Sequence, residues 1–122
     1  MRVIIAGSRT AKLESVLKAM SKCPWPVSEV VCGGAKGADS HGEYWASMQE
    51  PPAPVKYFHA DWATHGKAAG PLRNRDMALY ADALVLVWDG KSKGSLNMLE
   101  LALSYGLKLY VLTYPETLIT AE

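Results

Sequence analysis

Two apolar runs constrain the fold of this chain more than any other feature. Residues 2–6 and 83–88 are almost entirely apolar and show no alternation with polar side chains. A strand with one face in water alternates, whereas a strand buried on both faces does not, and such strands are typical of parallel sheets covered by helices. The two runs therefore predict central strands of a parallel α/β sheet.

The remaining chain alternates short apolar runs with helical patterns. Further strands are expected at 29–32, 55–58 and 107–113, and helices at about 13–20, 38–48, 72–81 and 96–105. Strands that alternate with helices favour parallel pairing through crossover connections. We therefore expect one Rossmann-like domain over residues 1–122, with about five parallel strands and helices on both faces.

Composition excludes several classes of protein. The 122 residues carry a net charge of +1, which argues against a dedicated duplex-DNA binder. No apolar run approaches the length of a membrane span and no signal peptide is visible, so we expect a cytoplasmic protein without a membrane partner. Cys23 and Cys32 lack CxxC spacing and the histidines lack metal-ligand spacing, so neither a metal site nor a cofactor is expected.

A glycine-rich turn joins the strand at 29–32 to the next helix. Gly33, Gly34 and Gly37 fall within five residues, together with Lys36. Such a turn lets a ligand approach the main chain closely, and its amides with those of the following helix form an anion site. The alternative is a tight turn that needs glycine only for its geometry.

Three other loops, at 7–10, 60–73 and 89–95, leave strands at the same end of the predicted sheet. In such sheets ligands bind beyond the carboxyl ends of the strands, so these loops are expected to face one crevice. A GxGxxG motif of the dehydrogenase type is absent from the sequence, and hydride chemistry is therefore not proposed.

Arg73 is the strongest single candidate for contact with an anion. With a helix beginning near residue 72, Arg73 and Arg75 would lie in its first turn, where a cation opposes the helix dipole. Arg73 shares a helix side with Met77, which places its head group over the strand ends. We expect it to bind phosphate; the alternative is a salt bridge to Asp76 or Asp39.

Other loop residues carry paired interpretations. Ser95 is a helix N-cap or a phosphate donor, and Asp39 complements a helix dipole or accepts from a ribose hydroxyl. Trp62 stacks on a base or covers the edge of the core. Ser8 and Arg9 meet phosphate or are ordinary polar loop residues. The complete set of predicted ligand-binding residues is Gly7, Ser8, Arg9, Gly33, Gly34, Lys36, Gly37, Asp61, Trp62, Gly70, Arg73, Asn74, Gly94 and Ser95.

Five motifs occur together in a familiar order, over residues 2–112. They resemble those of a small family within the SLOG superfamily of Rossmann-like domains, which includes the lonely-guy phosphoribohydrolases, the DNA-processing A proteins and sensors of nucleotide-derived signals. The resemblance implies a nucleotide-like ligand at these loops. The motifs are Gly-Ser-Arg at 7–9, Gly-Gly-Ala-Lys-Gly-Ala-Asp at 33–39, Ala-Asp-Trp at 60–62, Ala-Gly-Pro-Leu-Arg-Asn-Arg-Asp-Met at 69–77, and Trp-Asp-Gly at 88–90 with Gly94-Ser95.

One position departs from the phosphoribohydrolase pattern. Met98 stands where those enzymes have a glutamate, and Glu100 is about 200° further around the helix. Hydrolysis of an N-glycosidic bond needs a carboxylate near the sugar, and among Asp39, Asp61 and Asp89 we take Asp39 and Asp89 as the catalytic candidates. We expect binding of a phosphorylated nucleoside, with hydrolysis of its glycosidic bond if the protein is an enzyme. The alternatives are a non-catalytic nucleotide sensor and a module for single-stranded nucleic acid.

The helix at 96–105 has almost no polar face. Leu96, Leu99 and Leu103 are expected to cover the sheet, which leaves Met98, Leu101 and Tyr105 as an uncovered apolar patch. We expect a homo-oligomer that buries this patch. The alternative is that residues 115–122 fold back over it.

Overall fold

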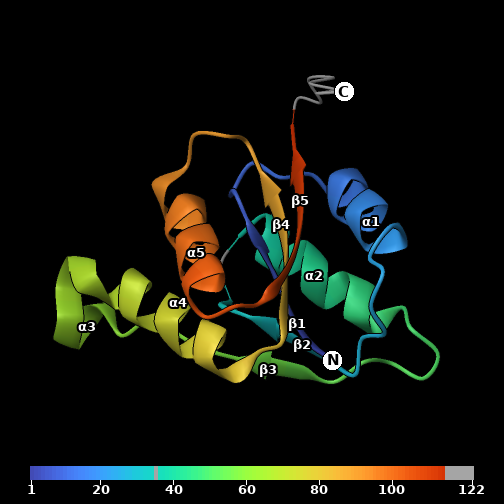
Figure 1. The fold of residues 1–122 in the computed structure, drawn as a ribbon, viewed down its shortest axis with the longest axis horizontal. Helices are drawn as coiled ribbons and strands as arrows, with labels where there is room; N and C mark the ends of the chain where they lie inside the picture. Colours follow the sequence, from blue (N-terminus) through green and yellow to red (C-terminus); the bar gives the residue numbers. More distant parts are fainter. Residues whose placement is uncertain (35, 115–122) are drawn as a thin grey trace.

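The computed structural model describes residues 1–34 and 36–114 of the chain. Five strands form one sheet in the order β3-β2-β1-β4-β5, and every neighbouring pair is parallel (Figure 1). The predicted α/β, Rossmann-like fold is confirmed. The strands are β1 (Arg2–Gly7), β2 (Glu29–Cys32), β3 (Val55–Tyr57), β4 (Ala83–Trp88) and β5 (Lys108–Thr113).

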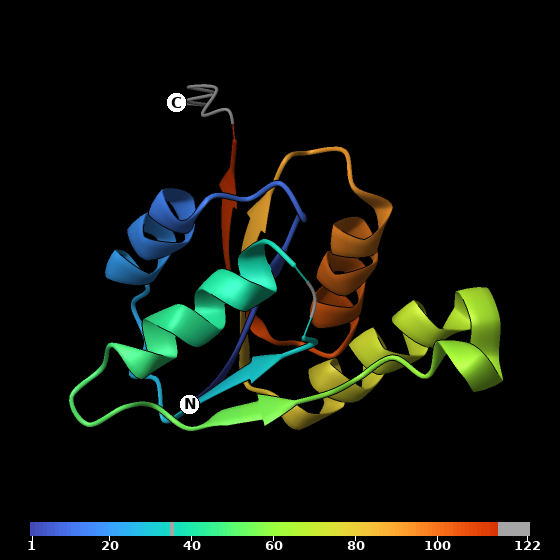
Figure 2. The ribbon, with the colours of Figure 1, turned by 180° about the vertical axis from the view of Figure 1, so that it is seen from behind.

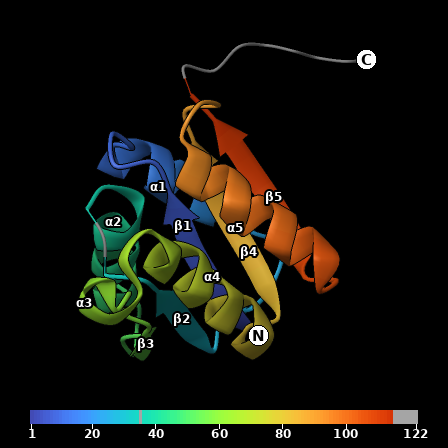
Figure 3. The same cartoon turned by 90° about the vertical axis from the view of Figure 1, so that its left-hand side faces the viewer.

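Helices cover both faces of this sheet. One face carries α1 and α2, the other carries α4 and α5, and α3 lies farthest from the sheet (Figures 1 and 2). Figure 3 shows α4 and α5 together in front of the strands. Among the described residues no helix combines the length and apolarity needed to cross a membrane. The helices are α1 (Leu13–Ser21), α2 (Ala38–Ser47), α3 (Trp62–His65), the 3₁₀ turn η1 (Gly66–Ala68), α4 (Ala69–Tyr80) and α5 (Lys93–Ser104).

The two apolar runs are buried on both faces, as their sequence predicts. Successive side chains of a strand point to opposite faces of the sheet. In β1, Val3 and Ile5 belong to the core beneath α1 and α2, whereas Ile4 belongs to the core beneath α4 and α5. All three are fully buried, which explains why this strand tolerates no polar side chain after Arg2.

The strand order reverses between β1 and β4. From β1 the chain proceeds outward through β2 to β3, and then crosses back to β4 on the other side of β1. Gly7 and Val87 are paired in register, and the Ser8 N–H donates to the Val87 carbonyl oxygen at 3.0 Å. Ligands of open α/β sheets bind at such a reversal, beyond the carboxyl ends of the strands.

Two helices begin three residues earlier than the sequence pattern predicts. The predicted loop before residue 72 contains α3, η1 and the start of α4 at Ala69. Pro71 fits there because the first-turn N–H groups of a helix have no intrahelical partner. The last helix, α5, begins at Lys93 and not at residue 96.

The expectation that Leu96 and Leu103 of α5 cover the sheet was wrong. Met98 and Ala102 are its buried apolar residues, at 1% and 0% exposure, whereas Leu96 and Leu103 are exposed at 41% and 61%. Leu101 is half-buried and packs against the core. Ala102 lets the helix backbone approach the sheet closely, which the larger leucines would prevent. Tyr105 is uncovered as expected, and residues 115–122 lie outside the described part of the chain.

Candidate functional site

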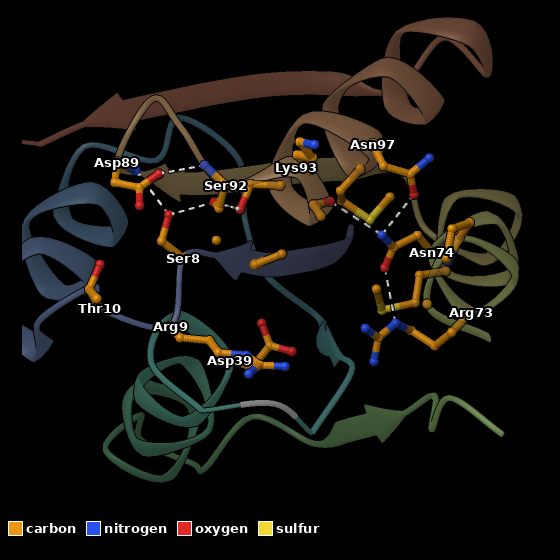
Figure 4. A pocket seen from close by; sticks show the side chains of 18 of the residues that line it. Ser8, Arg9, Thr10, Asp39, Arg73, Asn74, Asp89, Ser92, Lys93 and Asn97 are labelled. Atoms are coloured by element: carbon orange, nitrogen blue, oxygen red, sulfur yellow. Dashed lines mark hydrogen bonds between the residues drawn. The ribbon is translucent and has the colours of Figure 1, made fainter. Parts of the chain in front are cut away.

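A cavity of about 520 Å³ lies at the carboxyl ends of β1 and β4, where the strand order reverses (Figure 4). Its walls come from the loops after these two strands and from residues of α2, α3, α4 and α5. Met77 of α4 and Met98 of α5, both buried, form the apolar side of the cavity. The lining residues are Ala6, Gly7, Ser8, Arg9, Thr10, Asp39, Trp62, Gly70, Pro71, Arg73, Asn74, Met77, Asp89, Ser92, Lys93, Gly94, Ser95, Asn97 and Met98.

Every buried polar side chain of the described residues lines this cavity. Ser8, Asp39, Asn74 and Ser95 are exposed by only 2 to 6%. Burying a polar group costs free energy unless the group is hydrogen-bonded, so a cluster of buried polar side chains around one cavity indicates a functional site. They come from four separate segments of the chain. Their convergence marks the cavity as the candidate site.

A chain of three serine hydroxyls connects the loop after β1 to the first turn of α5. Ser8 Oγ lies 2.9 Å from Ser92 Oγ, and Ser92 Oγ donates to Ser95 Oγ at 3.0 Å. Ser8 Oγ also accepts a hydrogen bond of 2.9 Å from the backbone N–H of Asp89. The predicted N-cap role of Ser95 was wrong, because Ser92 occupies that position and Ser95 is the third residue of α5.

The carboxylate of Asp89 holds the loop between β4 and α5. Its Oδ1 accepts hydrogen bonds of 2.8 Å from the backbone N–H groups of Lys91 and of Ser92. These bonds favour the ionised carboxylate and lower the pKa of Asp89. Asp89 therefore lines the cavity as a carboxylate anion, and one of its two oxygens, Oδ1, already accepts two backbone hydrogen bonds.

Arg73 lies in the second turn of α4, since that helix begins at Ala69. The expected position in a first turn was therefore wrong, and so was the argument that its charge opposes the helix dipole. Arg73 Nε donates to Asn74 Oδ1 at 2.9 Å, and Nη1 donates to the Gly33 carbonyl oxygen at 2.9 Å. The alternative of a salt bridge to Asp76 is not what the described residues show: the ion pair of Asp76 is with Arg75, whose Nη2 lies 3.8 Å from Asp76 Oδ1.

Asp39 and Arg73 enclose Gly33 from two sides. Asp39 is in the first turn of α2, as predicted, and its Oδ2 accepts a hydrogen bond of 3.1 Å from the Gly33 N–H. A Cβ on Gly33 would lie 2.2 Å from Arg73 Nη1 and 3.1 Å from Asp39 Oδ2. Glycine is needed here because any side chain would displace the guanidinium.

The rest of the glycine-rich turn does not line the cavity. Gly37 has φ of +73°, and a Cβ there would lie 2.5 Å from the carbonyl oxygens of Ser8 and Arg9. Gly37 therefore packs against the loop after β1. Gly34 and Lys36 are exposed and outside the lining set, so for the described part of this turn the alternative based on geometry fits better than ligand contact.

Trp62 and Asp61, which are neighbours in sequence, have different roles. Trp62 begins α3, lines the cavity and is 57% exposed; α3 has no buried residue, so Trp62 does not cover the core. Asp61 is the N-cap of α3, and its Oδ1 accepts from the Thr64 N–H at 3.1 Å. Hydrogen bonds from the Thr64 side chain and from the Thr64 N–H lower the pKa of Asp61. Asp61 is not among the residues that line the cavity.

The structure thus brings most of the predicted ligand residues together. The cavity includes both catalytic candidates and, among the predicted binding residues, Gly7, Ser8, Arg9, Trp62, Gly70, Arg73, Asn74, Gly94 and Ser95. The cavity does not include Gly33, Gly34, Lys36, Gly37 and Asp61.

Sequence reasoning missed Ser92, Lys93, Asn97 and Thr10. Ser92 carried a usable signal, because serine directly before a helix is a preferred N-cap. Asn97 carried none, since its role depends on the packing of α5 against α4. Among the described residues, no group of three or more His, Cys, Asp or Glu side chains could hold a metal ion.

Comparison with known proteins shows similarity to a phage protein. The chain is 33% identical over 115 residues to the Gene 61 protein of Mycobacterium phage D29, an alignment that covers 87% of this chain and 91% of the phage protein. No family model matches the chain. No solved structure matches it either. The resemblance to the SLOG superfamily therefore stays a prediction.

Proposed function

The chain belongs to the family of the Gene 61 protein of Mycobacterium phage D29, and we propose that it binds a phosphorylated nucleoside in the cavity between β1 and β4. The observation that carries this proposal is the gathering of all buried polar side chains of the described residues around one cavity, beside a guanidinium with a free end. Cavities of this size accommodate ligands of several hundred daltons.

The phosphate is assigned to the space between Arg73 and the first turn of α5. Arg73 Nη2 makes no hydrogen bond within the described residues, so its two N–H groups remain for a ligand. The first-turn N–H groups of α5 have no intrahelical partner, and its N-cap side chain makes no capping bond. A Cβ on Gly94 would meet open space, so the backbone there is accessible. Helix N-termini of this kind bind phosphate.

The serine chain adds a donor at the same place. A hydroxyl has one proton, and Ser92 gives its proton to Ser95. Ser8 must then be the donor in its bond to Ser92. The proton of Ser95 remains available, and Ser95 is buried against the cavity. It would donate to an oxygen of the ligand.

Trp62 supplies an aromatic surface at the mouth of the cavity. Its indole is more than half exposed although it lines the cavity wall. A nucleobase stacked on it would bury apolar area that the free protein leaves in water. This contact favours a nucleoside over a simple phosphorylated sugar.

Binding without hydrolysis is better supported than catalysis. Both catalytic candidates use carboxylate oxygens to hold loops, Asp39 at Gly33 and Asp89 at Lys91 and Ser92. Met98, at the position of the phosphoribohydrolase glutamate, is buried against the cavity, while Glu100 is exposed on the outer side of α5. A nucleotide sensor therefore ranks ahead of a glycosidase, which would release free base.

Calorimetric titration with AMP, GMP, CMP and UMP tests the proposal, with the four matching nucleosides as controls. At least one monophosphate should bind, and its nucleoside should bind at least tenfold more weakly because the charged hydrogen bonds are lost. Equal affinity for nucleoside and nucleotide, or no binding of any of them, would contradict it. A short oligonucleotide tests the single-stranded alternative, since its affinity would fall steeply with salt.

A further inference from the structure

Asn74 has a buried side chain that connects α4 to α5. Its Nδ2 donates to Asn97 Oδ1 at 2.9 Å and to the Gly94 carbonyl oxygen at 3.4 Å. Its Oδ1 accepts from Arg73 Nε at 2.9 Å. Figure 4 shows this side chain between Arg73 and Asn97.

These bonds leave Asn74 without a donor for an anion. An asparagine side chain has two N–H donors, and both are used here within the protein. A phosphate oxygen accepts hydrogen bonds and donates none at neutral pH when it is ionised. Asn74 therefore lines the cavity but does not suit the ligand-binding role that its position in the sequence predicts.

The same bonds fix the orientation of Arg73. A guanidinium is planar, so hydrogen bonds at Nε and at Nη1 determine its plane and its rotation. The partner at Nη1 is the main chain of Gly33, and the partner at Nε is the side chain of Asn74. Because Asn74 is itself bonded to Gly94 and Asn97, the guanidinium is set relative to the first turn of α5.

We propose that Asn74 is a positioning residue, which aligns Arg73 with the amide groups at the start of α5 so that both address one anion. This inference rests on the proposed function, because it assumes an anion at that place. Holding the guanidinium in its binding orientation before the ligand arrives reduces the conformational entropy lost on binding. Asn74 would then increase the affinity for the anion only by orienting Arg73.

A double-mutant cycle with inorganic phosphate as the probe tests whether Asn74 acts on anion binding by orienting Arg73. Asn74→Ala should weaken phosphate binding about tenfold, as for a lost supporting hydrogen bond. In an Arg73→Ala background the same change should cost less than about twofold, because the residue through which it acts is gone. Arg75→Ala is the matched control, since Arg75 is on the same helix but half-exposed and lies near Asp76. An additive loss in the double variant would overturn the proposal.

A second measurement on the wild-type protein needs no variant. The Nε–H proton of Arg73 should exchange with solvent more slowly than that of Arg75 in NMR spectra, because only the former is bonded to a buried acceptor. Exchange as fast as that of Arg75 would overturn the positioning role, whether or not any ligand binds. If exchange is slow but neither phosphate nor a nucleoside monophosphate binds, the proposed function fails, and with it the role assigned to Asn74 in anion binding.

Discussion

Arg73 Nη1 donates a hydrogen bond of 2.9 Å to the carbonyl oxygen of Gly33, forty positions away in the sequence. This bond ties α4, on one face of the sheet, to the carboxyl end of β2. Two parts of the chain that the sequence marks as separate motifs are therefore one structural unit. The glycine-rich turn supports the arginine, and the arginine faces the cavity.

Gly37 packs against the loop after β1, so a side chain at this position should lower the stability of the fold. A valine Cβ would lie 2.5 Å from the carbonyl oxygens of Ser8 and Arg9, and φ is +73°. We expect Gly37→Val to lower the free energy of unfolding by about 1 to 3 kcal/mol from backbone strain, and further because the Cβ clashes with the two carbonyl oxygens. Thermal unfolding measures this change. Gly94→Ala is the control: its Cβ would meet open space in a helix, so stability should stay unchanged or rise.

The two cavity carboxylates predict the outcome of a hydrolysis assay. If the glycosidic bond of a bound nucleotide is cleaved, Asp39 or Asp89 must supply the charge, because Met98 cannot. Incubation with nucleoside monophosphates should then release free base, and Asp39→Asn or Asp89→Asn should abolish the release. Chromatography of the products measures it. Release that survives both substitutions would remove the assignment, whereas no release at all is the result that a sensor gives.

Asp89 should make stability depend on pH in the acid range. Its pKa is lowered by hydrogen bonds from the backbone N–H groups of Ser92 and Lys91. A lowered pKa in the folded state stabilises the fold above the unfolded value of about 3.9 and loses that effect as the pH falls through the folded pKa. Asp89→Ala should therefore melt below the wild type at pH 7, and the gap should narrow towards pH 2.5. A gap that is constant over this range would contradict the assignment.

Self-association through α5 remains a prediction, with a changed surface. Leu96 and Leu103 are exposed on one side of this helix, where the sequence pattern placed them in the core. Light scattering at micromolar concentration should give a dimer, which Leu103→Glu should dissociate. Leu101, which the sequence pattern placed in the uncovered patch, is half-buried against the core, so its substitution would confound folding with association. A monomeric wild type would refute the prediction; the alternative cover, residues 115–122, lies outside the described residues.

The sequence was most informative where burial was complete on both sides. β4 is recognisable because all of its first five residues are buried, so hydrophobic sequence and structure coincide. The faces of α5 were misassigned because Leu96 and Leu103 are exposed, whereas Met98 and Ala102 are buried, and apolarity alone does not show which side of an apolar helix faces the sheet. The cavity loops were found from glycine and serine signals. The hydrogen bonds among Arg73, Asn74 and Asn97 could not be predicted from the sequence, because they depend on how α4 packs against α5.

The affinity lost on removing the Arg73 side chain measures whether this guanidinium binds the phosphate of the ligand. Arg73→Ala and Arg75→Ala are titrated by calorimetry with the nucleoside monophosphate that the wild type binds best among AMP, GMP, CMP and UMP. The account predicts a loss of about 1.5 to 3 kcal/mol for Arg73→Ala, as for a hydrogen bond to a charged group, and no change for Arg75→Ala. Circular dichroism confirms that both variants are folded. Equal affinity of folded Arg73→Ala and wild type would contradict the account.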